Sequence, residues 1–148
     1  VTEELTGHDL VSLGIKVASG EKISLSQADI RIRGHAIQAR INAENPFDFS
    51  PAPGRLWECL LPSGPGIRVD SHACSGYSMP RSFDSLLAKV ISHGGDRKEA
   101  IARLDAALME TVLDGVETLI PLHRSILKEP NFLNRNVTIS YLEDHKLG

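Results

Sequence analysis

Arg40 is the residue whose type and place in the sequence best fit a role in chemistry. It lies within residues 34–46, where Ile37, Ala39 and Ile41 alternate with polar residues. Such alternation is typical of a half-buried strand, and Arg40 belongs to its polar face. A guanidinium is a planar, permanently charged set of donors that suits carboxylate, phosphate or bicarbonate. Two interpretations follow: a solvated or ion-paired arginine on an open sheet face, or an oxyanion-binding residue held on a rigid strand.

Other residue types that often serve catalysis or metal binding are scattered. Histidines occur singly, as His8, His35, His72, His93, His123 and His145. A histidine that stands alone is more often a hydrogen-bonded or surface residue than a ligand or base. The two cysteines, Cys59 and Cys74, have no Cys-x-x-Cys or paired-histidine spacing, so a structural zinc site is not expected. They are expected to be buried free thiols, with a single disulfide as the alternative.

Length and composition are those of one ordinary globular domain. The chain has 148 residues, of which 41% are hydrophobic and 24% charged, with a net charge of -3. No cluster of Lys and Arg suggests a nucleic-acid partner, and no signal-peptide pattern opens the chain. No apolar run approaches the roughly 20 residues that a membrane helix needs. Phosphate-binding loops, dinucleotide fingerprints and zincin motifs are absent from the sequence.

The first half of the chain is expected to be built mainly from strands. Before these strands, Asp9 is a plausible N-cap of a helix that follows it and ends near Gly20. Further strand patterns, separated by turns rich in proline and glycine, lie at residues 55–60 and 67–72. Residues 83–91 fit a buried strand or a short helix followed by a strand, because their apolar residues show neither period clearly.

The second half is expected to be helical. A capping box at residues 96–99 and an apolar stripe that reaches Val112 predict a helix closed by residues 114–115. A second helix is expected at residues 119–127, followed by a loop at residues 131–136 and a short terminal element. Because the predicted strands come first in the chain and the predicted helices come later, we expect an α+β fold with a mostly antiparallel sheet and helices packed on it.

Several motifs, taken together, resemble one family. They are Arg33-Gly34-His35-Ala36, Arg40-Ile41-Asn42-Ala43-Glu44, Ser50-Pro51-Ala52-Pro53-Gly54, Arg68-Val69-Asp70-Ser71-His72, Phe83-Asp84-Ser85-Leu86-Leu87-Ala88-Lys89, Asp114-Gly115-Val116-Glu117-Thr118 and Tyr141-Leu142-Glu143. In this order, and over nearly the whole chain, they closely resemble the C-terminal domain of biotin carboxylase, the ATP-grasp component of acetyl-CoA, propionyl-CoA and related biotin-dependent carboxylases. The resemblance implies a single domain over residues 1–148, in which residues 1–19 form a helix that joins to a preceding ATP-grasp domain.

The resemblance also implies an activity for the complete enzyme, which would be an ATP-dependent carbon-nitrogen ligase that carboxylates carrier-bound biotin with bicarbonate. Its cofactors would be ATP, magnesium and biotin, none of them held by this chain alone. Its partners would be the upstream ATP-grasp half, a biotin carboxyl carrier, a carboxyltransferase that selects the acyl acceptor, and a second copy in a homodimer, with no nucleic acid or membrane. The enzyme would lie in the bacterial cytoplasm or, alternatively, the mitochondrial matrix.

The chain alone is expected to be inactive. In the family, Val1 would follow an acidic metal-binding segment and the lysines that hold the nucleotide phosphates, so the chain is expected to be part of a longer polypeptide. It also has no Ala-Met-Lys-Met sequence for biotin attachment. Two alternatives without catalysis are a dimerisation or docking module and a ligand-binding domain that keeps the Arg40 anion site.

The resemblance assigns roles to single residues. Arg40 matches an arginine that lines the bicarbonate and biotin site, where donors aimed at developing negative charge stabilise the biotin enolate. Ile139 matches an aliphatic residue beside the adenine pocket. Arg68 and Asp84 match charged residues of a homodimer interface, although ordinary surface salt bridges would give the same pattern. Pro65 stands where relatives can carry an aromatic residue at that contact, which weakens the inference of a dimer.

Overall fold

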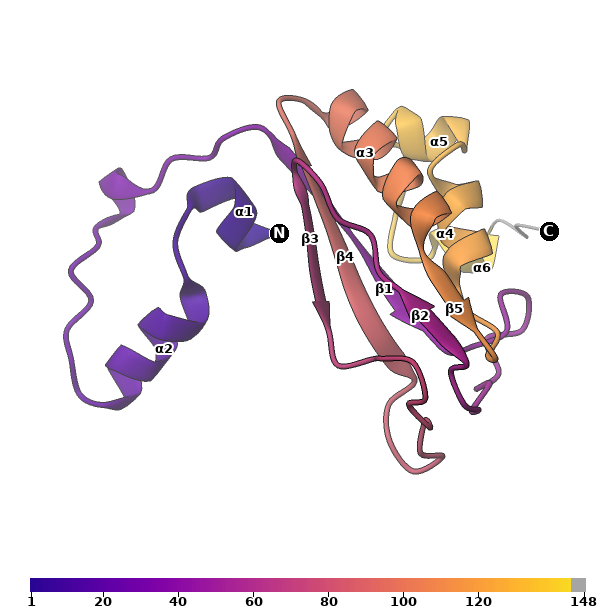
Figure 1. Ribbon diagram of the computed structural model, residues 1–148. Helices are drawn as coiled ribbons and strands as arrows, with labels where there is room; N and C mark the ends of the chain where they lie inside the picture. Colours follow the sequence, from indigo (N-terminus) through magenta and orange to yellow (C-terminus); the bar gives the residue numbers. More distant parts are fainter. Residues whose placement is uncertain (145–148) are drawn as a thin grey trace.

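A three-stranded antiparallel sheet lies at the centre of the computed structural model, which describes residues 1–144 (Figure 1). The sheet consists of β1 (His35–Asn42), β4 (Leu86–Gly94) and β3 (Ile67–Ser71), in the order β1-β4-β3. A separate antiparallel pair consists of β2 (Glu58–Leu60) and β5 (Val112–Asp114). The predicted α+β class with an antiparallel sheet is therefore confirmed. Of the ambiguous segment at residues 83–91, residues 86–91 belong to β4.

Strand β1 follows the predicted alternation. Ala39 and Ile41 are buried, whereas Gln38 and Arg40 are exposed. Since successive side chains of a strand point to opposite faces, Arg40 lies on the face away from the core.

Helix α3 (Arg97–Glu110) covers the other face of the sheet, as Figure 1 shows. Its N-terminus is capped as predicted, because Asp96 Oδ1 accepts a hydrogen bond from the Glu99 backbone N–H at 2.8 Å. The Ser92 hydroxyl on β4 donates to the Ala100 carbonyl at 2.8 Å and joins helix to sheet. The most fully buried large side chains are Ile41, Leu56, Leu87, Val90, Leu104 and Leu108.

Two predicted boundaries in the second half were wrong. The helix predicted to run to Asp114 ends at Glu110, and residues 112–114 form β5 instead, with Leu113 buried. Backbone pairing with β2, which is distant in sequence, outweighs the helical spacing of Val112. The loop predicted after residue 130 begins with a helix, α5 (Pro130–Leu133), whose proline occupies the first turn, where no N–H is required.

The remaining helices at the C-terminal end agree with the sequence analysis. The predicted second helix is α4 (Ile120–Ile126), with Pro121 in its first turn. The short terminal element is α6 (Tyr141–Asp144).

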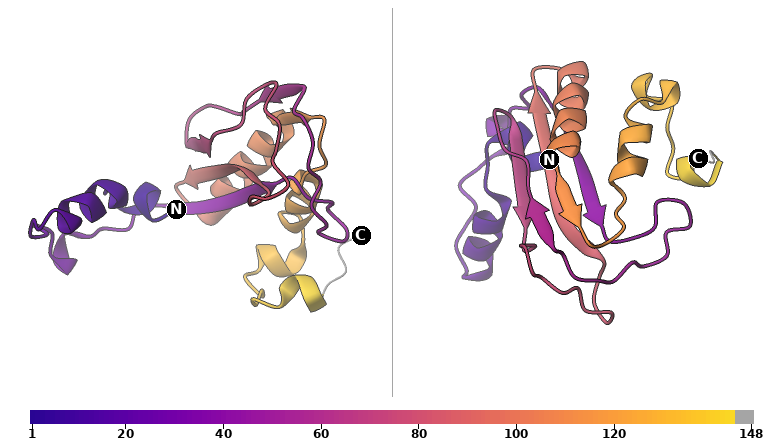
Figure 2. Two further views of the ribbon diagram at one scale, coloured as in Figure 1. Left: turned by 90° about the horizontal axis from the view of Figure 1, so that it is seen from below. Right: turned by 45° about the vertical axis from the view of Figure 1, so that its right-hand side comes forward.

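Residues 1–19 form two helices rather than the single expected one. Helix α1 (Thr2–Thr6) ends at Gly7, which has a φ of 72° that favours glycine. Helix α2 (Leu10–Ala18) begins after Asp9, whose carboxylate accepts a hydrogen bond from the Ser12 N–H at 2.8 Å. Residues 1–34, which include the 3-10 helix η1 (Gln27–Asp29), are all at least partly exposed. In this N-terminal arm, α1 lies beside the sheet, whereas α2 extends away from it (Figures 1 and 2).

The cysteines are free thiols, but the prediction that both are buried was wrong. Cys59 is half-buried and Cys74 is exposed. Burial raises the pKa of the Cys59 thiol. Across residues 1–144, no helix is both long enough and apolar enough to cross a membrane.

Candidate functional site

The candidate site is the face of the sheet that α3 leaves uncovered. Strands β1 and β4 pair with Arg40 directly opposite Lys89 and with Gln38 directly opposite Ile91. Residues directly opposite each other in an antiparallel pair have side chains on the same face. The side chains of Arg40 and Lys89 therefore emerge side by side from neighbouring strands.

The backbone of Arg40 is held from helix α4. The Arg40 carbonyl accepts a hydrogen bond from His123 Nε2 at 2.8 Å. A carbonyl can only accept, so the neutral His123 ring must carry its proton on Nε2. Burial lowers the pKa of His123, and its hydrogen bond to the Arg40 carbonyl partly opposes this shift. A second contact, from Leu119 N to the Asn42 carbonyl at 3.2 Å, also joins the start of α4 to β1.

The guanidinium of Arg40 is available for a ligand. Within residues 1–144, none of the ion pairs involves Arg40. Its side chain is exposed, whereas the neighbouring Ala39 is 3% exposed and fixes the strand against the core. A free, permanently charged donor set on a rigid strand can bind a small oxyanion.

A polar cluster follows Arg40 at the end of β1, and the sequence analysis did not identify it. Asn42 Nδ2 donates to Glu44 Oε1 at 2.9 Å and to Ser85 Oγ at 3.1 Å. The Ser85 hydroxyl also donates to Glu44, and in the described part of the chain Asn42 Oδ1 is buried without a hydrogen-bond partner. The alternation of β1 places Asn42 on the face of Arg40, but the contact with Ser85 joins segments far apart in sequence.

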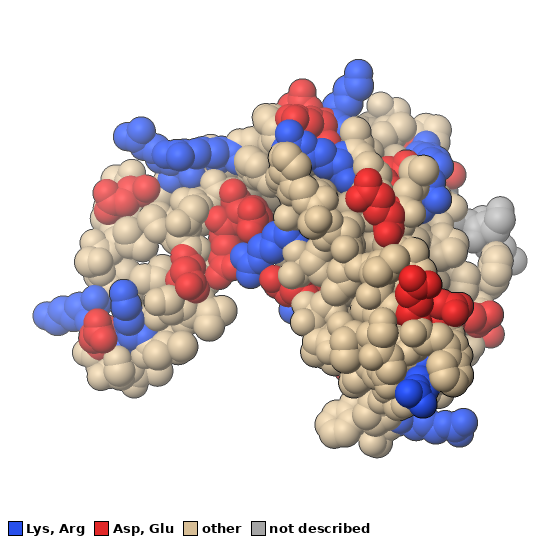
Figure 3. Space-filling model, viewed as in Figure 1, with Lys and Arg blue, Asp and Glu red and all other residues tan. Residues whose placement is uncertain are grey.

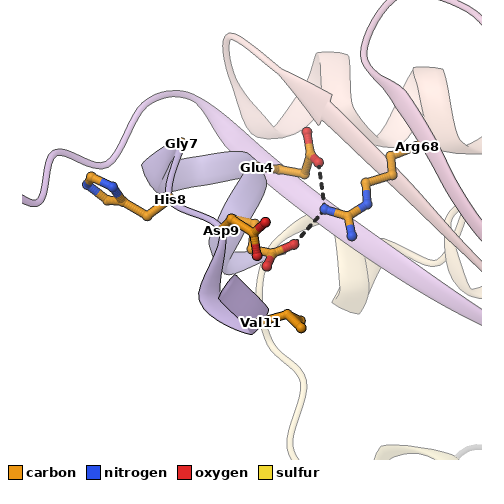
Figure 4. Close-up of a pocket in the computed structure, with 7 residues that line it drawn as sticks. Glu4, Gly7, His8, Asp9, Val11 and Arg68 are labelled. Carbon is orange, nitrogen blue, oxygen red and sulfur yellow. Dashed lines mark hydrogen bonds and ion pairs between the residues drawn. The ribbon is translucent and has the colours of Figure 1, made fainter. Parts of the chain in front are cut away.

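Arg68 lies on the same face, with β4 between it and Arg40, and its charge is already paired within the chain. Its Nη1 lies 2.6 Å from Glu3 Oε2 and 3.4 Å from Glu4 Oε1, and its Nε lies 2.9 Å from Asp70 Oδ1. Figure 4 shows the guanidinium pointing toward the carboxylates of the arm, in a pocket of about 470 Å³ between α1 and β3. Acidic and basic side chains alternate where the arm meets the sheet (Figure 3).

These contacts shift the pKa values of the pair. The hydrogen bonds that Arg68 donates to Asp70 and Glu3 raise the pKa of Arg68 above its ordinary value. The hydrogen bond from Arg68 holds the pKa of Glu3 below its ordinary value. Arg68 therefore fastens the arm to the sheet.

The other two predicted site residues lie apart from this face. Asp84 lies in the loop before β4, where its Oδ1 accepts a hydrogen bond from Leu86 N at 3.0 Å. Ile139 precedes α6, and its side chain is fully exposed. The structure thus places Arg40 and Arg68 on one face and leaves Asp84 and Ile139 elsewhere.

The donor set of the site suits an anion better than a metal ion. Magnesium prefers carboxylate oxygens in octahedral geometry. In residues 1–144, no group of three His, Cys, Asp or Glu side chains is placed to hold a metal ion. Magnesium does not fit the described residues, whereas bicarbonate fits the guanidinium of Arg40.

Comparison with known sequences gives consistent matches. A family model, the biotin carboxylase C-terminal domain, matches residues 38–144. The biotin carboxylase of Pseudomonas aeruginosa is 49% identical over 148 residues, which is 100% of this chain and 33% of the relative. The biotin carboxylase of Haemophilus influenzae is 47% identical over 148 residues, again 100% of this chain and 33% of the relative. The chain spans about a third of the length of these relatives.

Solved structures agree with the sequence matches. The biotin carboxylase domain dimer of Hydrogenobacter thermophilus 2-oxoglutarate carboxylase, in complex with MgADP, ADP and bicarbonate, is 40% identical with a TM-score of 0.94 and is matched over 98% of this chain and 32% of that chain. Biotin carboxylase of Campylobacter jejuni is 36% identical with a TM-score of 0.92, over 97% of this chain and 32% of that chain. This chain therefore belongs to the biotin carboxylase C-terminal domain family and corresponds to the C-terminal part of such enzymes.

Proposed function

We propose that this chain supplies the arginine-bearing wall of a biotin carboxylase site. The complete enzyme would use ATP to activate bicarbonate and would then carboxylate N1 of biotin on a carrier protein. The observation that supports this proposal is the free guanidinium of Arg40. The backbone carbonyl of Arg40 is held by a hydrogen bond from His123 Nε2 at 2.8 Å. The bicarbonate named in the Hydrogenobacter thermophilus structure supports the choice of anion.

The role of Arg40 follows from its chemistry. Its donors would bind bicarbonate and would later face the oxygen of the biotin enolate, where negative charge develops. Because a guanidinium stays protonated at physiological pH, Arg40 would orient and stabilise anions rather than transfer protons. ATP would supply the phosphoryl group that activates bicarbonate.

The other participants would be held by other parts of the enzyme. We infer that magnesium and the nucleotide phosphates bind to the upstream ATP-grasp half, and that Ile139, whose side chain is fully exposed, borders the adenine. The biotin carrier and the carboxyltransferase would be separate partners. Alone, the chain would be inactive, because phosphate stabilisation and proximity both require the upstream half.

A homodimer would be a property of the complete enzyme, as the dimer named for the Hydrogenobacter thermophilus domain suggests. A docking module built on Arg68 and Asp84 is less well supported, because three carboxylates surround Arg68 within this chain and Asp84 caps a local turn. Sedimentation of the isolated chain over a range of concentrations tests the module. A monomer at every concentration would argue against it.

ADP release with free biotin and bicarbonate tests the catalytic proposal. The chain would be assayed alone and joined to the upstream two thirds of the Pseudomonas aeruginosa relative. We expect activity only in the joined enzyme, and a decrease in kcat/KM of about 100- to 1,000-fold for Arg40→Ala. Arg40→Lys should restore little, because an ammonium lacks the planar fork.

The matched control is Arg31→Ala, which removes an exposed arginine of the arm and should leave turnover unchanged. A joined enzyme that folds and turns over equally well with Arg40→Ala would contradict the role of Arg40.

A further inference from the structure

Lys89 lies at the centre of a row of charged residues on the face of the sheet that α3 leaves uncovered. In the strand register, Lys89 is directly opposite Arg40 of β1 on one side and Asp70 of β3 on the other. All three side chains therefore belong to the same face. Lys89 is partly buried, and Val90 beside it is fully buried against the core, so β4 is fixed in position.

The carboxylate of this row, Asp70, is already used. Arg68 donates from Nε to Asp70 Oδ1 at 2.9 Å and from Nη2 to Asp70 Oδ2 at 3.1 Å. In the part of the chain that the structure describes, neither Lys89 nor Arg40 takes part in an ion pair. Two cations thus stand on adjacent strands, and neither is neutralised by a carboxylate of residues 1–144.

Such an arrangement favours the binding of an anion. Like charges directly opposite each other in a sheet repel, and an oxyanion placed between them removes the repulsion. Arginine and lysine also complement each other, because the guanidinium binds two oxygens in one plane whereas the ammonium donates to one oxygen from a flexible stem.

We propose that Lys89 is a second binding residue of the Arg40 site and donates from Nζ to the same oxyanion, of the bicarbonate class. This proposal rests on the proposed function and extends it to a residue of β4. Arg40 orients the anion, and Lys89 adds a second positive charge on the side of β4. Because β4 is the central strand of the sheet, the backbone that carries Lys89 is fixed in position.

Variants of the joined enzyme test the proposal by their bicarbonate kinetics. Lys89→Met should raise the KM for bicarbonate about 10- to 100-fold, as expected for the loss of one charged hydrogen bond. The KM for ATP should change less than about twofold, because nucleotide contacts are proposed to lie elsewhere. Lys89→Arg should keep most of the affinity for bicarbonate. Lys98→Met, which removes an exposed lysine from α3, is the matched control and should have no effect.

Binding without turnover is the second measurement. Line broadening of 13C-labelled bicarbonate by the ADP-loaded enzyme should weaken with Lys89→Met and stay normal with Lys98→Met. If Lys89→Met does not fold, Lys89→Gln keeps a polar side chain of similar length and is used for both measurements.

Several outcomes would overturn the proposal. One is an unchanged KM and unchanged line broadening in a folded Lys89 variant. Another is an unchanged affinity for bicarbonate together with either a lower melting temperature or a raised KM for ATP. That result would show that Lys89 pairs with a carboxylate of the upstream half instead of binding the anion. Failure of the proposed function itself is distinguishable, because Arg40→Ala would then leave turnover unchanged whatever residue stands at position 89.

Discussion

His123 Nε2 lies 2.8 Å from the carbonyl oxygen of Arg40, although the two residues are 83 positions apart in the sequence. This hydrogen bond joins α4 to β1 at the residue proposed to bind the anion. We therefore expect His123 to be a positioning residue, which would act on the ligand only through the backbone of Arg40.

Replacing His123 separates positioning from simple packing. His123→Leu leaves the Arg40 carbonyl without its donor and is expected to cost about 1–3 kcal/mol of unfolding free energy. In the joined enzyme, it should also raise the KM for bicarbonate. His123→Gln keeps an N–H donor and should recover most of both losses. Denaturant unfolding and bicarbonate kinetics measure these effects, and a leucine variant with wild-type values for both would contradict the positioning role.

His123 also predicts how stability depends on pH. Burial lowers its pKa in the folded chain, so the unfolded chain binds a proton more readily. Stability should therefore be fully present above the ordinary histidine pKa of about 6.5 and should fall as the pH decreases below it. Between about pH 7 and pH 5, wild type should lose more stability than His123→Gln. Parallel pH profiles for the two proteins would refute this assignment.

Arg68→Gln should release the N-terminal arm from the sheet. The variant removes the ion pairs of Arg68 with Glu3 and Glu4 and leaves the core intact. Limited proteolysis within residues 1–34 should become faster. In an NMR titration the pKa of Glu3 should rise toward its ordinary value, because Arg68 is the largest cause of its lowering. The stability that Glu3 contributes should be present at neutral pH and lost as the pH falls through its pKa.

The control is Arg81→Gln, at an exposed arginine that has no ion pair with the described part of the arm. It should change neither the rate of proteolysis within residues 1–34 nor the titration of Glu3. An unchanged Glu3 titration in Arg68→Gln would show that the ion pair between Arg68 and Glu3 does not form in solution.

Gly34→Ala should destabilise the start of β1. Gly34 has a φ of 68°, and an added Cβ would overlap the carbonyl oxygen of Gly94 on the paired strand. The strained backbone is expected to cost about 1–3 kcal/mol, before any shift of β4 is included. Gly14→Ala is the matched control, because nothing lies within 4 Å of its added Cβ and the residue is inside helix α2. Thermal unfolding should show a loss for the first variant and a gain of up to about 1 kcal/mol for the second.

Local patterns predicted the parts of the fold that depend on near neighbours in sequence. The alternation around Arg40 predicted β1 and its exposed face, and the capping residues Asp9 and Asp96 predicted the starts of two helices. The helical spacing up to Val112 gave a wrong boundary, because pairing with a distant strand is absent from a local pattern.

The candidate site was likewise predicted from the sequence only in part. The residue order was enough to establish the family and to single out Arg40, since an arginine on the polar face of a strand is visible in the alternation of its neighbours. The folded chain was needed to place Lys89 opposite Arg40, His123 behind it, and Glu3 on Arg68. The physical reason is that strand register and contacts between distant segments are decided by how the whole core packs, whereas alternation and capping require only a few consecutive residues.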